Sequence, residues 1–128
     1  MDPLSRYDPI VDDPAAFHDA CERPLPSVVR VNEIKATPVH GWVYGQEEVS
    51  AVPALALDPD PDERVLDCCA APGSKTTQLA ARMDDRGLLV GNDNNLGRLS
   101  ALRSNAERCG VTNLVVTRAD ARNFSVKP

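Results

Sequence analysis

The chain has 128 residues, enough for one domain of ordinary size, and it contains no run of about 18 apolar residues that would span a membrane. Its formal net charge of −5 disfavours a nucleic-acid binder, which usually presents a basic surface. An excess of Asp over Lys is also typical of proteins from very salty cytoplasm, where screening makes net charge uninformative about partners. Four cysteines, at positions 21, 68, 69 and 109, match no zinc pattern, so we expect no metal and a reducing, cytoplasmic location.

Proline is distributed unevenly along the chain. Nine of the eleven prolines lie at or before Pro61, so we interpret residues 1–62 as an irregular arm or a small appended α+β extension. Its first segment, Met1 to Pro14, is acidic and proline-rich and does not look like a signal peptide.

Short apolar runs within this first part predict regular elements. We expect two strands, a helix that contains Pro53 at a kink or in an early turn, and a stiff acidic linker, at residues 27–35, 41–44, 47–57 and 58–62. Trp42 and Tyr44 fall in or beside the second strand. We interpret them as part of an apolar strand face, with stacking on a nucleic-acid base as the less favoured alternative.

A regular alternation of strands and helices begins at Arg64. The predicted elements are strand 64–68, helix 74–83, strand 88–91, helix 96–109 and strand 113–117. In the second helix, apolar residues recur at steps of three and four, and Gly110 ends it. Strand–helix–strand–helix–strand with short links predicts a parallel sheet with right-handed crossovers, so residues 63–128 form one half of a doubly wound α/β domain.

Three acidic residues fall at or just past the carboxyl ends of the successive strands, namely Asp67, Asp93 and Asp120. Ligands bind at this edge of a doubly wound sheet. Asp93 is placed to accept from two ribose hydroxyls, Asp120 from an adenine amine, and Asp67 lies near enough to favour an ammonium group. Each acid taken alone is more often a turn former or a helix cap, but three in register favour a ligand site.

The turn after the first of these strands is built from small residues, with Pro72 and Gly73 followed by a helix that starts at Ser74. Free amides at this helix start suit a carboxylate. A carboxylate, an ammonium, a ribose and an adenine together describe S-adenosylmethionine. NAD fits less well, because the Gly-x-Gly-x-x-Gly loop that usually holds its pyrophosphate is absent.

The segment from Val65 to Thr77 resembles the cofactor motif Val-Leu-Asp-x-Cys-Ala-Ala-Pro-Gly-Gly-Lys-Thr of the Nop/Sun family of RNA cytosine-5 methyltransferases, with Ser74 replacing the second Gly. Arg30 to Lys35 is similar to the family's Arg-Val-Asn-Thr-Leu-Lys strand, and Gln46 to Leu57 to its Gln-Asp-x-x-Ser segment. The resemblance implies a partial Rossmann-like class I methyltransferase fold, a parallel sheet with helices on both faces.

The resemblance also implies a cofactor site and a reaction. S-adenosylmethionine would be bound by nine residues, at its methionine end by Cys69, Ala70, Ala71, Pro72, Gly73, Ser74 and Lys75, at its ribose by Asp93 and at its adenine by Asp120. The family adds a methyl group to carbon 5 of a cytosine in tRNA or rRNA, with a cysteine thiolate as nucleophile.

Neither catalytic cysteine of the family is matched in this sequence, because both occur in later segments that would fall beyond Pro128. We therefore assign no catalytic residue. We expect the chain to be the cofactor half of a truncated or split enzyme and to be inactive alone. Its partner would be the missing C-terminal half or a second chain. The alternatives are a non-catalytic module that binds the cofactor or a partner, and a class I methyltransferase acting on a small molecule. The Ala-Ala-Pro-Gly-x-Lys motif argues against a methyltransferase that acts on a small molecule.

Overall fold

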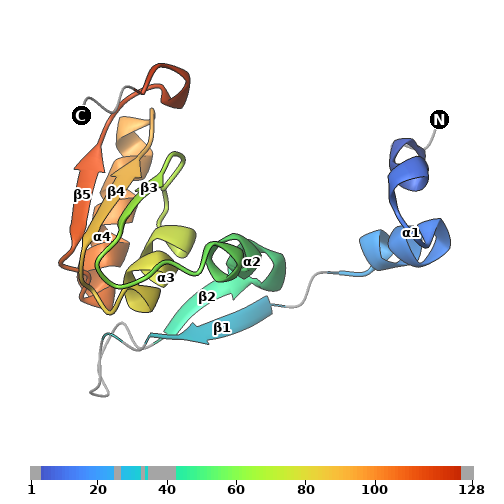
Figure 1. The fold of residues 1–128 in the computed structure, drawn as a ribbon, viewed down its shortest axis with the longest axis horizontal. Helices are drawn as coiled ribbons and strands as arrows, with labels where there is room; N and C mark the ends of the chain where they lie inside the picture. The colour runs from blue at the N-terminus through green and yellow to red at the C-terminus, as the bar shows by residue number, and fades with distance from the viewer. Residues whose placement is uncertain (1–3, 25–26, 33, 35–42, 125–128) are drawn as a thin grey trace.

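The computed structural model describes residues 4–24, 27–32, 34 and 43–124. Within these residues it contains four α-helices, two 3-10 helices and five strands (Figure 1). In chain order they are η1 (Ser5–Ile10), α1 (Pro14–Glu22), β1 (Ser27–Val31), β2 (Val43–Glu47), α2 (Glu48–Leu57), β3 (Arg64–Asp67), α3 (Ser74–Arg82), β4 (Leu88–Asn92), α4 (Leu96–Cys109), β5 (Leu114–Thr117) and η2 (Ala121–Asn123).

The N-terminal arm contains a helix that the sequence analysis did not predict. In α1 the side chain of Asp13 accepts a hydrogen bond of 2.9 Å from the amide of Ala16, and Pro14 occupies the first helical position. These are standard signals for a helix start. Tyr7 of η1 packs edge-on against Phe17 of α1, with ring centroids 5.8 Å apart. Figure 1 draws this arm apart from the rest of the chain.

Strands β1 and β2 form an antiparallel hairpin that leads into α2. The first predicted strand is observed as Ser27–Val31, and residues 33 and 35 of the prediction lie outside the described residues. Asn32, which follows β1, donates a 2.7 Å hydrogen bond from its side chain to the carbonyl oxygen of Cys109. The second strand runs from Val43 to Glu47, and residues 41 and 42 of the prediction lie outside the described residues. The predicted helix is confirmed as α2, with Pro53 inside it.

The hairpin is joined to the α/β body through Tyr44, whose side chain is buried. The guanidinium groups of Arg30 and Arg108 lie 5.5 and 5.4 Å from the centre of its ring. Burial lowers the pKa of Arg30 and raises the pKa of the Tyr44 hydroxyl. Arg30 also donates a 2.7 Å hydrogen bond to the hydroxyl of Thr77 on α3. Tyr44 is therefore part of a strand face, as expected, and is not open for stacking on a base.

The predicted parallel strand–helix–strand–helix–strand unit is confirmed. Strands β3, β4 and β5 are parallel and hydrogen-bonded in that order, so each new strand is added on the same side of the previous one. Helices α3 and α4 are the two crossovers, and Gly110 follows α4 with a φ of 79°. The carboxyl ends of the three strands meet at the upper edge of the sheet in Figure 1.

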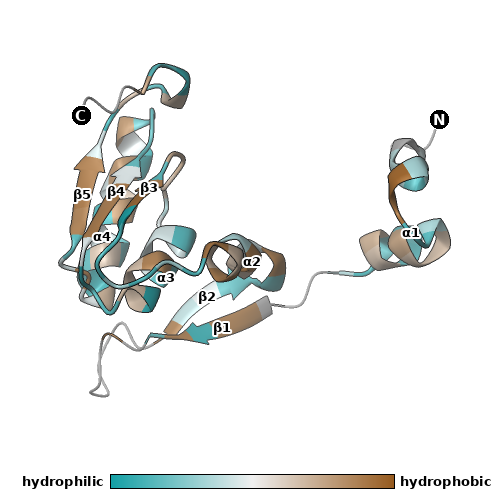
Figure 2. Cartoon of the chain, viewed as in Figure 1, coloured by the Kyte–Doolittle hydropathy of each residue, from teal (hydrophilic) through white to brown (hydrophobic). Residues whose placement is uncertain are grey.

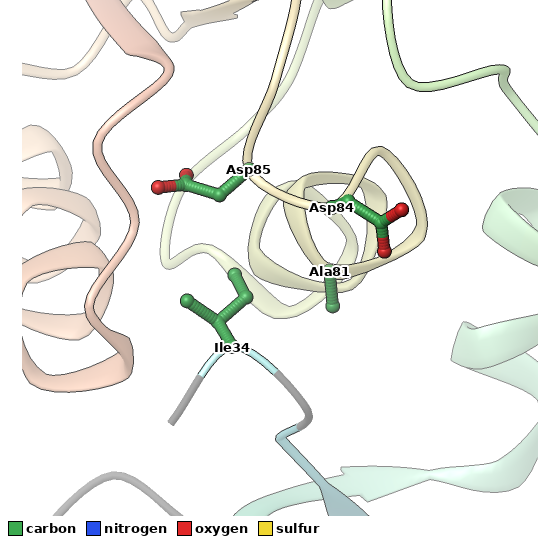
Figure 3. Close-up of a pocket in the computed structure, with 4 residues that line it drawn as sticks. All are labelled: Ile34, Ala81, Asp84 and Asp85. Carbon is green, nitrogen blue, oxygen red and sulfur yellow. The ribbon is translucent and has the colours of Figure 1, made fainter. Parts of the chain in front are cut away.

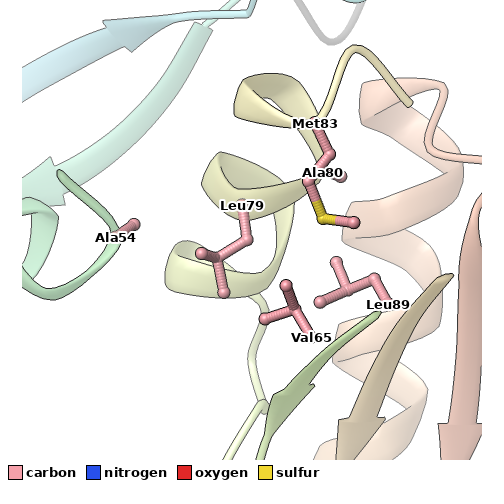
Figure 4. Packing of buried hydrophobic residues seen from close by; sticks show 6 residues of the cluster. All are labelled: Ala54, Val65, Leu79, Ala80, Met83 and Leu89. Carbon is pink, nitrogen blue, oxygen red and sulfur yellow. The ribbon is translucent and has the colours of Figure 1, made fainter. Parts of the chain in front are cut away.

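Both crossover helices pack on the same face of this sheet. Leu79, Ala80 and Met83 of α3 contact Val65 and Leu89 of the strands, together with Ala54 of α2 (Figure 4). Two right-handed crossovers that advance in the same direction must place their helices on one face. We expected helices on both faces of the sheet, but within the described residues helices pack on only one face.

The second face of the sheet is lined by Leu66, Val90 and Val115, which lie side by side in the strand register. None of them is fully buried, and Val115 is 49% exposed. Figure 2 shows the strands as predominantly hydrophobic. The half sheet thus presents an apolar face that no described element covers.

Candidate functional site

Asp67, the first of the three strand-end acids, is used to fix the turn that follows β3. One carboxylate oxygen accepts a 2.7 Å hydrogen bond from the hydroxyl of Thr76, which is completely buried, and the other accepts a 3.3 Å bond from the amide of Cys69. The Thr76 hydroxyl also lies 3.3 Å from the carbonyl oxygen of Ala70. The structure therefore gives Asp67 an internal role in holding this turn, and its expected contact with an ammonium group stays a prediction.

The turn itself is held by packing against α4. Ala70 and Ala71 are buried in a cluster with Leu99 and Leu102. Gly73 has a φ of 111°, and a Cβ atom there would lie 3.0 Å from a methyl carbon of Leu102, so only glycine fits this position without strain.

Pro72, Ser74 and Lys75 of the predicted turn are less enclosed. Pro72 is exposed, but its carbonyl oxygen accepts a 2.9 Å hydrogen bond from the side chain of Asn105. The Ser74 hydroxyl donates a 3.0 Å bond to the side chain of Gln46 at the end of β2. Lys75 is exposed in the first turn of α3. The turn is thus anchored to α4 and to the hairpin at the same time.

Asn92, at the end of β4, was missed by the sequence analysis. Asn92 is 1% exposed, and its side-chain amide donates hydrogen bonds of 3.0 Å to the carbonyl oxygens of Cys68 and Ala119. Its oxygen accepts a 3.1 Å bond from the hydroxyl of Thr117. One side chain therefore links the loops that follow the two neighbouring strands. The sequence shows only an Asn next to Asp93, and that signal is too weak to predict these hydrogen bonds.

Asp93 directly follows β4 and is 3% exposed. One carboxylate oxygen accepts a 2.9 Å hydrogen bond from the amide of Asn95, and the other lies 3.4 Å from the guanidinium of Arg98. Arg98 also donates a hydrogen bond to the carbonyl oxygen of Ala71. Asn95, and not Asp93, caps α4, because its side chain accepts from the amide of Arg98. Asp93 is therefore not the residue that caps α4.

Asp120 lies past β5, where it caps η2. Its carboxylate accepts hydrogen bonds from the backbone amide and from the guanidinium of Arg122, at 3.0 Å and at 2.5 to 3.1 Å. These side-chain and backbone hydrogen bonds hold the pKa of the Asp120 carboxyl below its usual range. A second hydrogen-bonding group can reach this carboxylate only by sharing it with Arg122 or displacing it.

The loops after the three strands enclose one cavity of about 250 Å³. Three of the nine predicted cofactor residues line it, Cys69, Asp93 and Asp120, and the turn residues 70–75 do not. Its other lining residues are Cys68, Asn94, Arg98, Ala119, Ala121 and Arg122. Ligand pockets usually measure about 300–1,000 Å³. The cavity is therefore small for a whole cofactor, and it provides two carboxylates from neighbouring strand ends for polar groups of a ligand.

A larger cavity, of about 370 Å³, lies at the opposite edge of the sheet and is lined by Ile34, Ala81, Asp84 and Asp85. Its two carboxylates point away from one another (Figure 3). Asp85 is used structurally, since it accepts hydrogen bonds from the amides of Thr112 and Asn113 at 2.8 and 3.1 Å. Among the described residues, no cluster of His, Cys, Asp and Glu is suited to a metal ion, and no helix could cross a membrane.

A parallel half sheet with its crevice at the carboxyl ends of the strands, and acids after the second and third strands, is the arrangement of class I methyltransferases. Residues 54–128 match the family model described as 16S rRNA methyltransferase RsmB/F. The chain belongs to this family, which confirms the Nop/Sun resemblance found in the sequence.

Individual relatives agree with this assignment. The ribosomal RNA small subunit methyltransferase F of Enterobacter sp. (strain 638) is 35% identical over 153 aligned positions, which cover 85% of this chain and 32% of that protein. A methyltransferase homologue from Pyrococcus horikoshii superimposes with a TM-score of 0.73 at 26% identity, covering 94% of this chain and 58% of that one. NSun6 from Pyrococcus horikoshii, solved with SFG, has a TM-score of 0.63 at 35% identity, covering 74% and 24%.

The chain therefore spans about a third of the length of the curated relatives that it matches. What those longer proteins do is attributed to this chain only as a proposal.

Proposed function

We propose that this chain provides the cofactor-binding half of an S-adenosylmethionine-dependent RNA methyltransferase that makes 5-methylcytosine in rRNA or tRNA. The observation that carries the proposal is that Cys69, Asp93 and Asp120, three of the predicted cofactor residues, line one cavity at the carboxyl ends of neighbouring strands. Membership of the RsmB/F family supports the reaction class and an RNA substrate.

The residues around the crevice suit a charged nucleoside. The buried carboxylate of Asp93 has one oxygen in a hydrogen bond to a backbone amide, while its other oxygen makes only a 3.4 Å contact with Arg98. That second oxygen is placed to accept from ribose hydroxyls. Asp120 would accept from an adenine amine, with Arg122 giving way. S-adenosylmethionine supplies the methyl group when it is bound.

The methionine end of the cofactor would lie along residues 69–75. The first amides of α3 are free of intrahelical partners, and their dipole is positive at this end, which favours a carboxylate. Gly73 leaves the backbone accessible there, since it has no side chain. Ala70 and Ala71 would contribute through their backbone, because their side chains are buried against α4.

None of the four cysteines is assigned a catalytic step. Cys109 is buried at the end of α4, Cys21 lies on the arm, and Cys68 and Cys69 are in the turn after β3. Methyl transfer to cytosine requires a thiolate beside the base, which by family resemblance comes from later segments. RNA is the partner that this reaction requires. We place it in the cytoplasm, where thiols stay reduced.

The first test is titration of the chain with S-adenosylmethionine in a calorimeter. We expect one site per chain, and we expect Asp93→Asn to weaken binding at least about tenfold, because a hydrogen bond to a charged group contributes about 1.5–3 kcal/mol. The variant keeps the oxygen that accepts from Asn95, so the start of α4 is preserved.

Asp84→Asn is the matched control. Asp84 is exposed at the opposite edge of the sheet, and Asn tolerates its positive φ of 52°. Equal affinity of all three proteins for S-adenosylmethionine would contradict the assignment of Asp93, and a folded wild-type chain that does not bind would overturn the cofactor proposal.

A further inference from the structure

The charges of the α/β body are segregated between the two edges of its sheet. The segments before the three strands, residues 58–63, 83–87 and 110–113, hold six acidic residues and one arginine. The segments at the carboxyl ends of the strands, residues 67–75, 93–98 and 118–124, hold four basic and three acidic residues. The net charge of −5 therefore hides a basic edge, and it is the edge that carries the crevice.

The four basic residues of this edge form what we term the crevice ring, which consists of Lys75, Arg98, Arg118 and Arg122. All four are exposed, with 54% of the Arg98 side chain and 87% of the Arg122 side chain accessible. Arg98 and Arg122 line the cavity directly. Lys75 is in the first turn of α3, and Arg118 is in the loop after β5.

Two members of the ring carry a positive charge that no described carboxylate neutralises. Arg98 pairs with Asp93 and Arg122 with Asp120. Among the described residues, Lys75 has no acidic partner, and the guanidinium of Arg118 donates only to the carbonyl oxygen of Asn94, at 3.3 Å. The amino ends of α3 and α4 point to the same edge, and their dipoles add partial positive charge. This edge of the molecule attracts anions, while the acidic edge repels them.

We propose that the crevice ring is the surface on which the phosphates of an RNA strand dock, so that the strand crosses the mouth of the cofactor crevice. The inference rests on the proposed function, because RNA is the polyanion that the proposed reaction requires. The charges of this surface favour RNA, because phosphate groups bind exposed Arg and Lys side chains. The acidic segments before the strands repel RNA, so the chain approaches the polymer with its crevice foremost. Arg118 is then a positioning residue that touches the RNA backbone and not the reacting base.

The test compares two exposed arginines in the same chain, one at each edge of the sheet. Arg118→Gln removes a ring charge, and Arg86→Gln removes a charge from the acidic edge. Binding of a fluorescein-labelled single-stranded oligocytidylate is followed by anisotropy over a range of salt concentrations. We expect Arg118→Gln to weaken binding about threefold and to lower the salt slope by about 0.7, the value for one phosphate contact on a single strand, and Arg86→Gln to change neither.

Arg118→Lys separates charge from local structure, because it keeps the cation and loses the planar group that donates to Asn94. Retained RNA affinity in this variant supports the phosphate contact. Loss equal to that of Arg118→Gln, equal weakening by Arg86→Gln, or no weakening by Arg118→Gln overturns the inference.

Calorimetry with S-adenosylmethionine on the same samples separates this inference from the proposed function. Cofactor binding without oligocytidylate binding overturns the crevice ring and leaves the cofactor site standing. Oligocytidylate binding that depends on Arg118, without cofactor binding, supports the ring and contradicts the proposed function.

Discussion

Asn92 shows how a single buried side chain fixes the shape of the crevice. Its three hydrogen bonds connect the turn after β3, the end of β4 and the loop after β5. The two carboxylates of the cavity, Asp93 and Asp120, lie next to these connected segments. The spacing between the two acids therefore depends on an amide that contacts neither of them.

Replacing Asn92 with Asp keeps the size of the side chain and turns both donated hydrogen bonds into contacts between a carboxylate and carbonyl oxygens. We expect the free energy of unfolding to fall by about 3 kcal/mol, because buried polar groups lose their partners. Asn94→Asp makes the same change on an exposed neighbour and should cost less than about 0.5 kcal/mol. Urea denaturation of both variants measures this, and equal stabilities would contradict the role of Asn92.

Some features of the site residues could be predicted from the sequence, and others could not. The strand-end positions of Asp93 and Asp120 follow from apolar strands of similar length, since parallel strands end at one edge, and the sequence predicted them. Asp67 has the same pattern, but the hydroxyl of Thr76 takes its carboxylate. Which internal partner each of the three acids has is decided by side-chain geometry, and no spacing rule contains that information.

At the scale of elements, helices with a clear apolar period were predicted closely. The range of α4 is the predicted one, and α3 is one residue shorter than predicted. The contact between Asn32 and Cys109 could not be predicted, because the two residues are 77 positions apart in the sequence. Helix α1 has a readable start at Asp13 and Pro14, but the proline-rich composition around it outweighed this signal.

The hairpin depends on Tyr44 for its attachment to the α/β body. Tyr44→Ala should lower the free energy of unfolding by about 3 kcal/mol, because it removes a buried aromatic ring that contacts two guanidinium groups. Tyr44→Phe keeps the ring and loses only a long, 3.4 Å hydrogen bond from Asn105, so it should cost less than about 1 kcal/mol. Thermal unfolding distinguishes the two, and a large loss with Phe would show that the hydroxyl matters more than the ring.

At the scale of the whole molecule, the described chain has one covered and one uncovered sheet face. Leu66, Val90 and Val115 form the uncovered row, and β3 has no described strand on its outer side. In a doubly wound fold, strand order reverses beside the first strand, and helices reach the second face only after that reversal. The longer relatives have enough chain for such a second half.

We therefore expect the isolated chain to be marginally stable and inactive. Its free energy of unfolding should fall at or below about 5 kcal/mol, the low end for natural domains, and Val115→Lys should reduce its self-association because it places a charge on the uncovered face. Urea denaturation and light scattering measure these properties. Methyl transfer from radiolabelled S-adenosylmethionine to rRNA or tRNA by the isolated chain would contradict the expected inactivity.

The junction between hairpin and body also bears on the order of folding. Contacts among β3, α3, β4, α4 and β5 join neighbours along the chain, whereas Arg108 reaches back 65 positions to Val43 and Asn32 forward 77 positions to Cys109. Closing such long loops costs more conformational entropy and slows folding. We expect the half sheet to assemble first and the hairpin to dock last, against a turn that is already in place to receive it.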